Sequence, residues 1–180
     1  MNNFKMLAFE GMQGVGKTTQ VNLIKDYLEK TYKSHNFKIF RQDPEDKSSV
    51  LSLNSDISQF LEVPENIAIL DGTIASVVIL SDVTRNHYGT TIQELDTEVK
   101  SYLNLIHKYR TVNCLLVSDN IEFLEKRTGF NSIYLETYLK GFHYFEQSQI
   151  ASNLNYLRIN LLSTDKIITV FDKIKKSLNI

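Results

Sequence analysis

The stretch Gly11-Met12-Gln13-Gly14-Val15-Gly16-Lys17-Thr18 matches G-x-x-x-x-G-K-[ST], the loop that binds phosphate groups in nucleotide-binding proteins. Apolar residues 6–9 before it predict a short strand, and residues 19–28 after it predict an amphipathic helix. A glycine loop between a strand and a helix turns backbone N–H groups towards phosphate oxygens, and the helix N-terminus adds favourable dipole charge. The alternative is a chance glycine turn, and both flanking patterns argue against it.

The pattern assigns distinct roles to the residues of this loop. The nucleotide phosphates would be bound by Gly11, Gln13, Gly14, Val15, Gly16, Lys17, Thr18 and Thr19. Among these residues, Lys17 would reach the β- and γ-phosphates, and the Thr18 hydroxyl would hold Mg²⁺. The sequence therefore predicts ATP and Mg²⁺ as cofactors.

Length, charge and cysteine content narrow the function classes. The 180 residues are enough for a full core, so we expect a single domain over residues 1–180. A formal net charge of -1 gives no reason to expect a nucleic acid or a membrane surface as partner. We find no basic and apolar leader and no apolar run of membrane-spanning length, so we expect a cytoplasmic protein. Cys114 is the only cysteine and lies in an apolar run, which predicts a buried, inert thiol.

Strand and helix patterns alternate along the whole chain. Strands are expected at residues 6–9, 37–41, 67–70, 112–117 and 156–161. Helices are expected at residues 19–28, 50–61 and 74–81, and over residues 91–109. Further helices are expected to end near residue 124, to span residues 132–149, and to close the chain towards its C-terminus. This alternation predicts an α/β protein: a three-layer doubly wound fold with a five-stranded parallel sheet.

Three of these helices carry a predicted N-terminal cap. Residues 91–94 form a capping box. Ser118 or Asp119 is expected to cap the helix that reaches residue 124. Ser163 or Thr164 is expected to cap the last helix. That helix is predicted to carry Ile167, Ile168, Phe171 and Ile174.

Two acidic residues follow predicted strands. Ligands of doubly wound sheets bind beyond the carboxyl ends of the strands, which gathers the glycine loop, residues 42–44, Asp71 and residues 118–120 along one edge. Asp71 ends an apolar strand, where a carboxylate supports the Mg²⁺ that bridges the β- and γ-phosphates; the alternative is an acid that begins a turn with Gly72. Asp43 could accept a proton from an acceptor hydroxyl, or bind a sugar or the Mg²⁺ shell; the alternative is a turn acid before Pro44.

Two arginines are candidates for contacts with phosphate or base. Arg127 could close from a lid over about residues 126–132, with Gly129 as its hinge, onto the charge that develops in phosphoryl transfer. The alternative for Arg127 is a helix C-terminus with a glycine stop and cations paired to the helix dipole. Arg85 is a weaker candidate for the acceptor phosphate or base, and a solvated surface arginine is the alternative.

Aromatic residues and histidines add little to the expected site. The helix at residues 132–149 carries Tyr138, Phe142, Tyr144 and Phe145, which could line a base pocket, but this spacing more often belongs to a core. The histidines form no metal-ligand set.

Longer motifs resemble the thymidylate kinase and deoxynucleoside kinase group of phosphate-loop kinases. Residues 9–20 resemble the thymidylate kinase opening Phe-Glu-Gly-x-Asp-Gly-x-Gly-Lys-Thr-Thr-Gln and depart from it only at Gln13. Asp43-Pro44 is similar to a Glu-Pro pair whose glutamate is the general base at the sugar hydroxyl in the deoxynucleoside kinases. Residues 71–76 are similar to Asp-Arg-Tyr-x-x-Ser, with Asp71 and Ser76 kept. Tyr138-Leu139-x-x-Phe142-His143 is similar to the Tyr-Leu-x-x-Leu-His helix of deoxynucleoside kinases.

The resemblance implies the nucleotide-kinase fold and transfer of the ATP γ-phosphoryl group to a nucleoside monophosphate. It further implies Lys17, Asp43, Asp71 and Arg127 as catalytic residues. Asp43, Ser76 and Arg85 would bind the substrate. A homodimer, with residues 91–109 at its interface, follows by analogy. A deoxynucleoside kinase is the first alternative.

Two departures from the family pattern, at Gly72 and in the lid, support a second alternative, a degenerate non-catalytic nucleotide-binding protein. Gly72 replaces an active-site arginine. Ile79-Leu80-Ser81 replaces the Ala-Tyr-Gln of thymidylate kinases, so their thymine contacts cannot be carried over to this chain. The expected lid carries only Lys126 and Arg127. A switch-type hydrolase ranks below both alternatives, because no water-positioning residue is identified.

Overall fold

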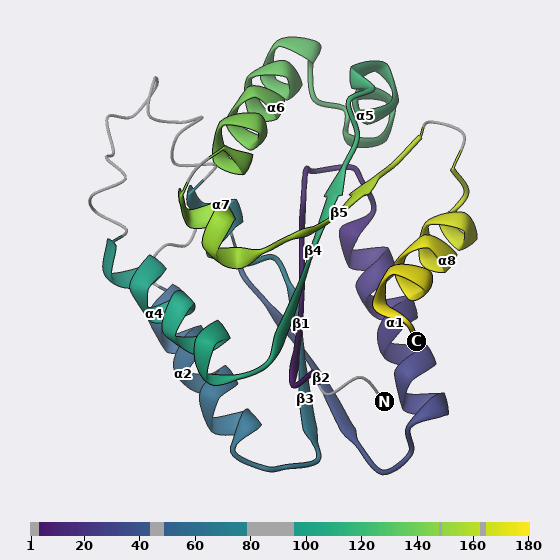
Figure 1. The fold of residues 1–180 in the computed structure, drawn as a ribbon. Helices are drawn as coiled ribbons and strands as arrows, with labels where there is room; N and C mark the ends of the chain where they lie inside the picture. Colours follow the sequence, from purple (N-terminus) through teal and green to yellow (C-terminus); the bar gives the residue numbers. More distant parts are fainter. Residues whose placement is uncertain (1–3, 44–48, 79–95, 148, 163–164) are drawn as a thin grey trace.

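A computed structural model of the chain describes residues 4–43, 49–78, 96–147, 149–162 and 165–180 (Figure 1). Within them the chain forms one five-stranded sheet with the strand order β2-β3-β1-β4-β5. All neighbouring strands are parallel. The strands are β1 (Met6–Gly11), β2 (Asn36–Arg41), β3 (Asn66–Asp71), β4 (Thr111–Val117) and β5 (Leu157–Asn160).

Helices cover both faces of the sheet. The named helices are α1 (Lys17–Thr31), α2 (Ser49–Leu61), α4 (Asp96–Lys108), α5 (Ile121–Thr128), α6 (Ser132–Glu146), α7 (Gln149–Leu154) and α8 (Ile167–Leu178). In Figure 1, α1 and α8 lie side by side on one flank, and α2 and α4 on the other, while α5 and α6 lie near the carboxyl ends of the strands. The predicted three-layer α/β fold with a five-stranded parallel sheet is confirmed.

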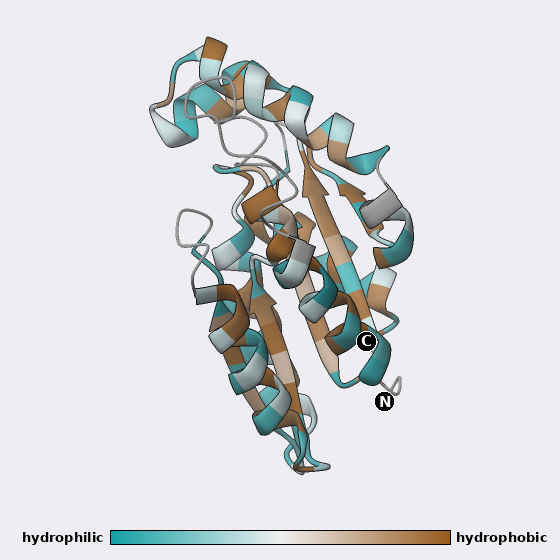
Figure 2. Ribbon diagram, turned by 90° about the vertical axis from the view of Figure 1, so that its left-hand side faces the viewer, coloured by the Kyte–Doolittle hydropathy of each residue, from teal (hydrophilic) through white to brown (hydrophobic). Residues whose placement is uncertain are grey.

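The apolar content of each strand matches its place in the sheet. β1 and β3 are buried along their whole length, because helices cover both faces of these inner strands. β2 lies at an edge and alternates between exposed and buried residues. Figure 2 shows the apolar strands between helices of mixed hydropathy. The central position of β1 places the glycine loop that follows it at the middle of the carboxyl edge.

The register brings the ends of distant segments together at this edge. Phe9 of β1 pairs with Asp71 of β3, which in turn pairs with Arg41 of β2. On the other side of β1, Gly11 pairs with Leu116 of β4. Residues far apart in the sequence therefore leave the sheet next to the glycine loop.

Several predicted helix limits were wrong. The single helix predicted at residues 132–149 is two helices, because α6 ends at Glu146 and α7 begins at Gln149. The cap of α5 is Asn120 rather than Ser118 or Asp119, since the Asn120 side chain accepts a hydrogen bond from the Phe123 N–H.

The last helix also differs from its prediction. Lys166 takes the N-cap position of α8 without a side-chain hydrogen bond, and the predicted caps Ser163 and Thr164 lie outside the described residues. The helix does carry the predicted Ile167, Ile168, Phe171 and Ile174, although the exposed fractions of Ile167 and Ile168 are 55% and 58%. The buried face of α8 consists of Val170, Ile174 and Leu178.

Other predictions concern packing and partners. Tyr138, Phe142 and Phe145 are buried in the core, as their helical spacing favoured, whereas Tyr144 is exposed. The capping box at residues 91–94 lies outside the described residues, and the predicted dimer interface stays a prediction. Among the helices that the structure describes, none is long and apolar enough to span a membrane.

Candidate active site

Two glycines of the loop have a backbone conformation that other residues rarely adopt. Gly14 and Gly16 have φ angles of 82° and 86°, in the left-handed region that glycine enters without strain. Gly16 is the N-cap of α1, so the first turn of this helix faces the loop. A Cβ atom at Gly11 would lie 2.6 Å from the Leu116 carbonyl oxygen of β4. The glycines therefore allow a tight loop that packs closely on the sheet.

A cavity of about 600 Å³ opens above this loop. Its walls come from the β1–α1 loop, the ends of β2 and β3, and α5, which Figure 1 shows converging at the carboxyl edge. Predicted site residues in its lining are Gln13, Gly14, Gly16, Lys17, Thr18, Thr19, Asp43, Asp71 and Arg127. Met12, Arg41 and Gln42 complete the lining. The structure thus brings together residues predicted separately as phosphate, metal and lid contacts.

Three predicted residues are not part of this lining, and a fourth is not described. Val15 is buried, with an exposed fraction of 2%, and Gly11 lies within β1. Ser76 is buried, and its hydroxyl donates a hydrogen bond of 2.5 Å to Glu10, so it faces the interior beneath the loop. Arg85 lies outside the described residues.

Asp71 presents an unsatisfied oxygen at the end of β3. The residue is 6% exposed, and its Oδ2 lies 3.5 Å from the Arg41 Nε. Its buried Oδ1 has no hydrogen-bond partner among the described residues. A buried carboxylate oxygen without a donor is costly unless a cation or water reaches it. Asp71 is therefore suited to hold a cation that enters the cavity.

The end of β2 supplies a second wall. The buried side chain of Gln42 donates hydrogen bonds to the Asp43 carbonyl at 2.8 Å and to the Ser49 hydroxyl at 3.2 Å, which ties this turn to α2. Asp43 is exposed and lines the cavity. The prediction from sequence missed Arg41, although its place directly before Gln42 on the same edge was a usable signal.

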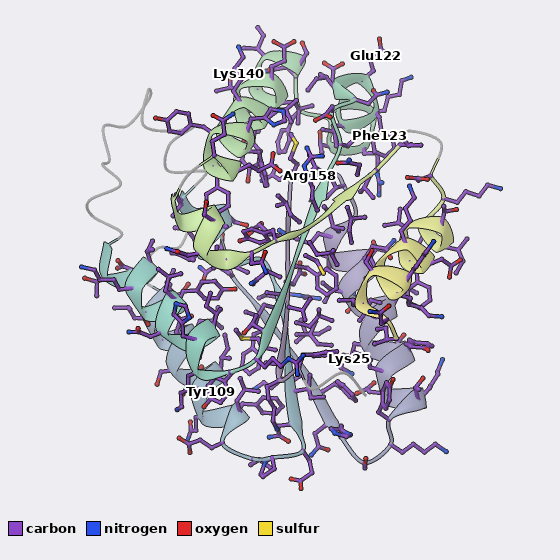
Figure 3. The ribbon with its side chains drawn as sticks, in the orientation of Figure 1. Lys25, Tyr109, Glu122, Phe123, Lys140 and Arg158 are labelled. Atoms are coloured by element: carbon purple, nitrogen blue, oxygen red, sulfur yellow. The ribbon has the colours of Figure 1, made fainter. Side chains whose placement is uncertain are left out.

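Arg127 lies over the glycine loop from α5. One guanidinium nitrogen lies 3.2 Å from the position that a Cβ atom at Gly16 would occupy. The Arg127 Cζ lies 5.3 Å from the centre of the Phe123 ring, and Figure 3 shows Phe123 on α5. Gly129 ends α5 with a φ of 72°, and its N–H binds the Glu125 carbonyl. Arg127 therefore lies at the C-terminus of a helix that a glycine ends, and its cationic group also lines the cavity.

Burial raises the pKa of several side chains so far that they cannot act as acids or bases near neutral pH. Burial, with the nearby negative charge of Glu10, raises the pKa of the Tyr102 and Tyr138 phenols. Cys114 is buried as predicted, and burial raises the pKa of its thiol to about 12. Asp43 and Asp71 remain the acidic residues in the cavity lining that the structure describes.

Comparisons with known proteins match the fold to nucleoside and nucleotide kinases. No protein-family model and no curated protein matches the sequence. Deoxyadenosine kinase from M. mycoides, solved with bound dATP, is 18% identical with a TM-score of 0.62, over 97% of this chain and 100% of that one. Thymidylate kinase from Ehrlichia chaffeensis is 19% identical with a TM-score of 0.60, over 96% and 97% of the two chains. Thymidylate kinase from Candida albicans is 13% identical with a TM-score of 0.62, over 98% and 92%. The chain therefore has the phosphate-loop kinase fold of the thymidylate and deoxynucleoside kinases, as its sequence motifs predicted.

Proposed function

We propose that this protein transfers the γ-phosphoryl group of ATP to a nucleoside monophosphate, in the manner of a thymidylate kinase. One observation carries the proposal: one cavity is lined by the glycine loop with Lys17, by Arg127, and by Asp71, whose Oδ1 has no hydrogen-bond partner within the described part of the chain. Phosphoryl transfer depends mainly on positioning and on stabilising charge that spreads over phosphate oxygens. Cations and N–H donors around one cavity meet that requirement.

Each group has a distinct task in this reaction. The loop N–H groups from residues 14–16 bind the phosphates of ATP, and Lys17 neutralises the group that is transferred. The bond between the γ-phosphorus and the oxygen bridging to the β-phosphate breaks, and a bond from the acceptor oxygen to the γ-phosphorus forms. Arg127 offsets the charge on the equatorial oxygens from the α5 side.

The residues present fit a Mg²⁺ ion that arrives with the nucleotide. Mg²⁺ in phosphoryl-transfer sites is commonly held by one or two carboxylates, substrate phosphates and water. Asp71 offers one such carboxylate, and Thr18 offers a hydroxyl at the start of α1. The described residues contain no cluster of three or more His, Cys, Asp or Glu side chains that could hold a metal ion by themselves. When bound, Mg²⁺ would supply positive charge that offsets the negative charge of the nucleotide phosphates.

A nucleoside acceptor is the second candidate, and Asp43 favours it. A hydroxyl acceptor must lose a proton, whereas an acceptor phosphate is already anionic. The exposed Asp43 carboxylate lines the same cavity as Lys17 and could take that proton. With a monophosphate as acceptor, Asp43 would instead bind the acceptor sugar.

Gly72 stands where the related kinases have an active-site arginine, but other cationic side chains line the cavity. Gly72 has a φ of 87°, where a side chain is strained, and a Cβ there would lie 3.2 Å from the Gln42 carbonyl oxygen. Arg41 and Arg127 line the cavity together with Lys17. Their cationic groups support a catalytic role over a non-catalytic nucleotide-binding one.

A coupled assay of ADP release tests the function. Purified protein with ATP and Mg²⁺ is expected to release ADP with thymidine monophosphate faster than with thymidine. The Lys17→Ala variant should lose transfer yet stay folded. Lys25→Ala is a matched control, because Lys25 lies on the same helix and pairs with Glu29 at 2.6 Å, outside the cavity lining (Figure 3). Undiminished activity in Lys17→Ala would refute the assignment. Tight ATP binding without turnover across a panel of nucleosides and nucleotides would favour the non-catalytic alternative.

A further inference from the structure

A buried carboxylate lies beneath the phosphate loop. Glu10 belongs to β1, and no part of it is exposed. Its Oε1 accepts hydrogen bonds from the Gly11 N–H at 2.9 Å and from the Ser76 hydroxyl at 2.5 Å. Its Oε2 accepts hydrogen bonds from the N–H and the hydroxyl of Thr73, at 3.1 and 2.9 Å, and from the Ser76 N–H at 3.0 Å. This set of donors holds the carboxylate in one position.

The same carboxylate contacts the lysine of the loop. The Lys17 Nζ lies 3.6 Å from the Glu10 Oε1, and the Lys17 side chain is 21% exposed. On another side, the ammonium lies 3.7 Å from the position that a Cβ atom at Gly72 would occupy. An ammonium has three N–H donors, so contact with Glu10 on its inner side leaves donors for phosphate on the cavity side.

We propose that Glu10 is a positioning residue that acts through Lys17. Glu10 holds the ammonium at the cavity wall and offsets part of its charge, so ATP binds less tightly while the ammonium stays in place for transfer. Interactions that strengthen only in the transition state raise kcat, whereas tighter binding of ATP alone does not. Glu10 also fixes residues 73–76, which follow the metal-binding candidate Asp71. The catalytic part of this inference rests on the proposed phosphoryl transfer.

A double-mutant cycle on ATP affinity tests whether Glu10 acts through Lys17. Calorimetry with the full chain compares Glu10→Gln in the presence of Lys17 and in the Lys17→Met background. With Lys17 present, ATP is expected to bind about tenfold more tightly after Glu10→Gln, because the freed ammonium pairs fully with phosphate. In the Lys17→Met background, the shift should stay below about threefold. Equal shifts in both backgrounds, or weaker binding in a folded Glu10→Gln variant, would overturn the proposal.

The transfer assay supplies the second readout. The Glu10→Gln variant is expected to lose about 10- to 100-fold in kcat while its ATP affinity rises, a split that simple loss of structure does not produce. The double variant Thr73→Val and Ser76→Ala keeps the charge but loosens the carboxylate, and it covers the case in which Glu10→Gln does not fold. Its ATP affinity should stay within about twofold of the wild type while kcat falls by about tenfold. An unchanged kcat in the double variant contradicts the positioning role. If no acceptor is phosphorylated, the proposed function fails, and the binding cycle still decides whether Glu10 acts through Lys17.

Discussion

Replacement of Arg127 by alanine separates catalysis from stability most clearly. The guanidinium lies over Gly16, with a nitrogen 3.2 Å from the position of a Cβ atom there. At about 4 Å and an effective dielectric constant of about 20, it would attract a phosphoryl charge by about 4 kcal/mol. Arg127 is exposed, so solvent and the ordering of a long side chain reduce this value. We expect Arg127→Ala to raise the barrier by about 1.4–2.7 kcal/mol, which lowers kcat about 10- to 100-fold.

The same substitution should have little effect on the fold. Arg127 lies in the last turn of α5 and over the Phe123 ring, contacts that contribute about 1 kcal/mol at an exposed site. Lys126→Ala is the matched control, because Lys126 is exposed in the same helical turn but absent from the cavity lining. Steady-state ADP release and thermal unfolding of both variants would be measured side by side. Equal kcat values for Arg127→Ala and Lys126→Ala would refute the role of Arg127.

The other predictions concern the metal ligand, acid stability and the thiol. In the wild type, Mg²⁺ should increase the affinity for ATP, and Asp71→Asn should remove most of this increase. Calorimetry in the presence of Mg²⁺ and in the presence of a chelator measures it for both proteins. An equal increase in the variant would exclude Asp71 as a metal ligand. The hydrogen bonds that Asp165 accepts from Lys173, at 2.6 Å, and from the Leu162 N–H lower the pKa of its carboxyl group. The ionised carboxylate therefore stabilises the fold above the unfolded-state pKa of about 4. This contribution is lost as the pH falls through the lower pKa of the folded state. Urea unfolding should therefore show wild type and Asp165→Asn converging in acid, and a constant gap from neutral to acid pH would contradict this. Cys114 should react with a thiol reagent only after denaturation. Rapid labelling of the folded protein would contradict the burial of this thiol.

Patterns confined to one segment were readable from the sequence. The spacing of the loop glycines, Lys17 and Thr18 reflects one strand–loop–helix unit, which sterics and hydrogen bonding constrain within a few residues. The apolar run ending at Asp71 likewise identified a central strand, because only a strand covered on both faces tolerates unbroken apolar residues. Asp71 and Arg127 were identified as candidates in the same way, from their places at the ends of a strand and a helix, and both line the cavity. The parallel α/β fold followed from the order of such segments.

Contacts between segments required the tertiary structure. Ser76 was expected to bind substrate, yet its hydroxyl donates to Glu10, which lies 66 residues away and meets it because β1 and β3 are neighbours in the sheet. Arg41 faces Asp71 for a similar reason, since β2 pairs with β3. No local spacing encodes which strands pair, so no pattern could reveal these partners. The sequence alone determined a strand, a glycine loop of the phosphate-loop pattern and a helix within a parallel α/β fold. Only the tertiary structure decided which charges surround Lys17, because sheet order and register place them.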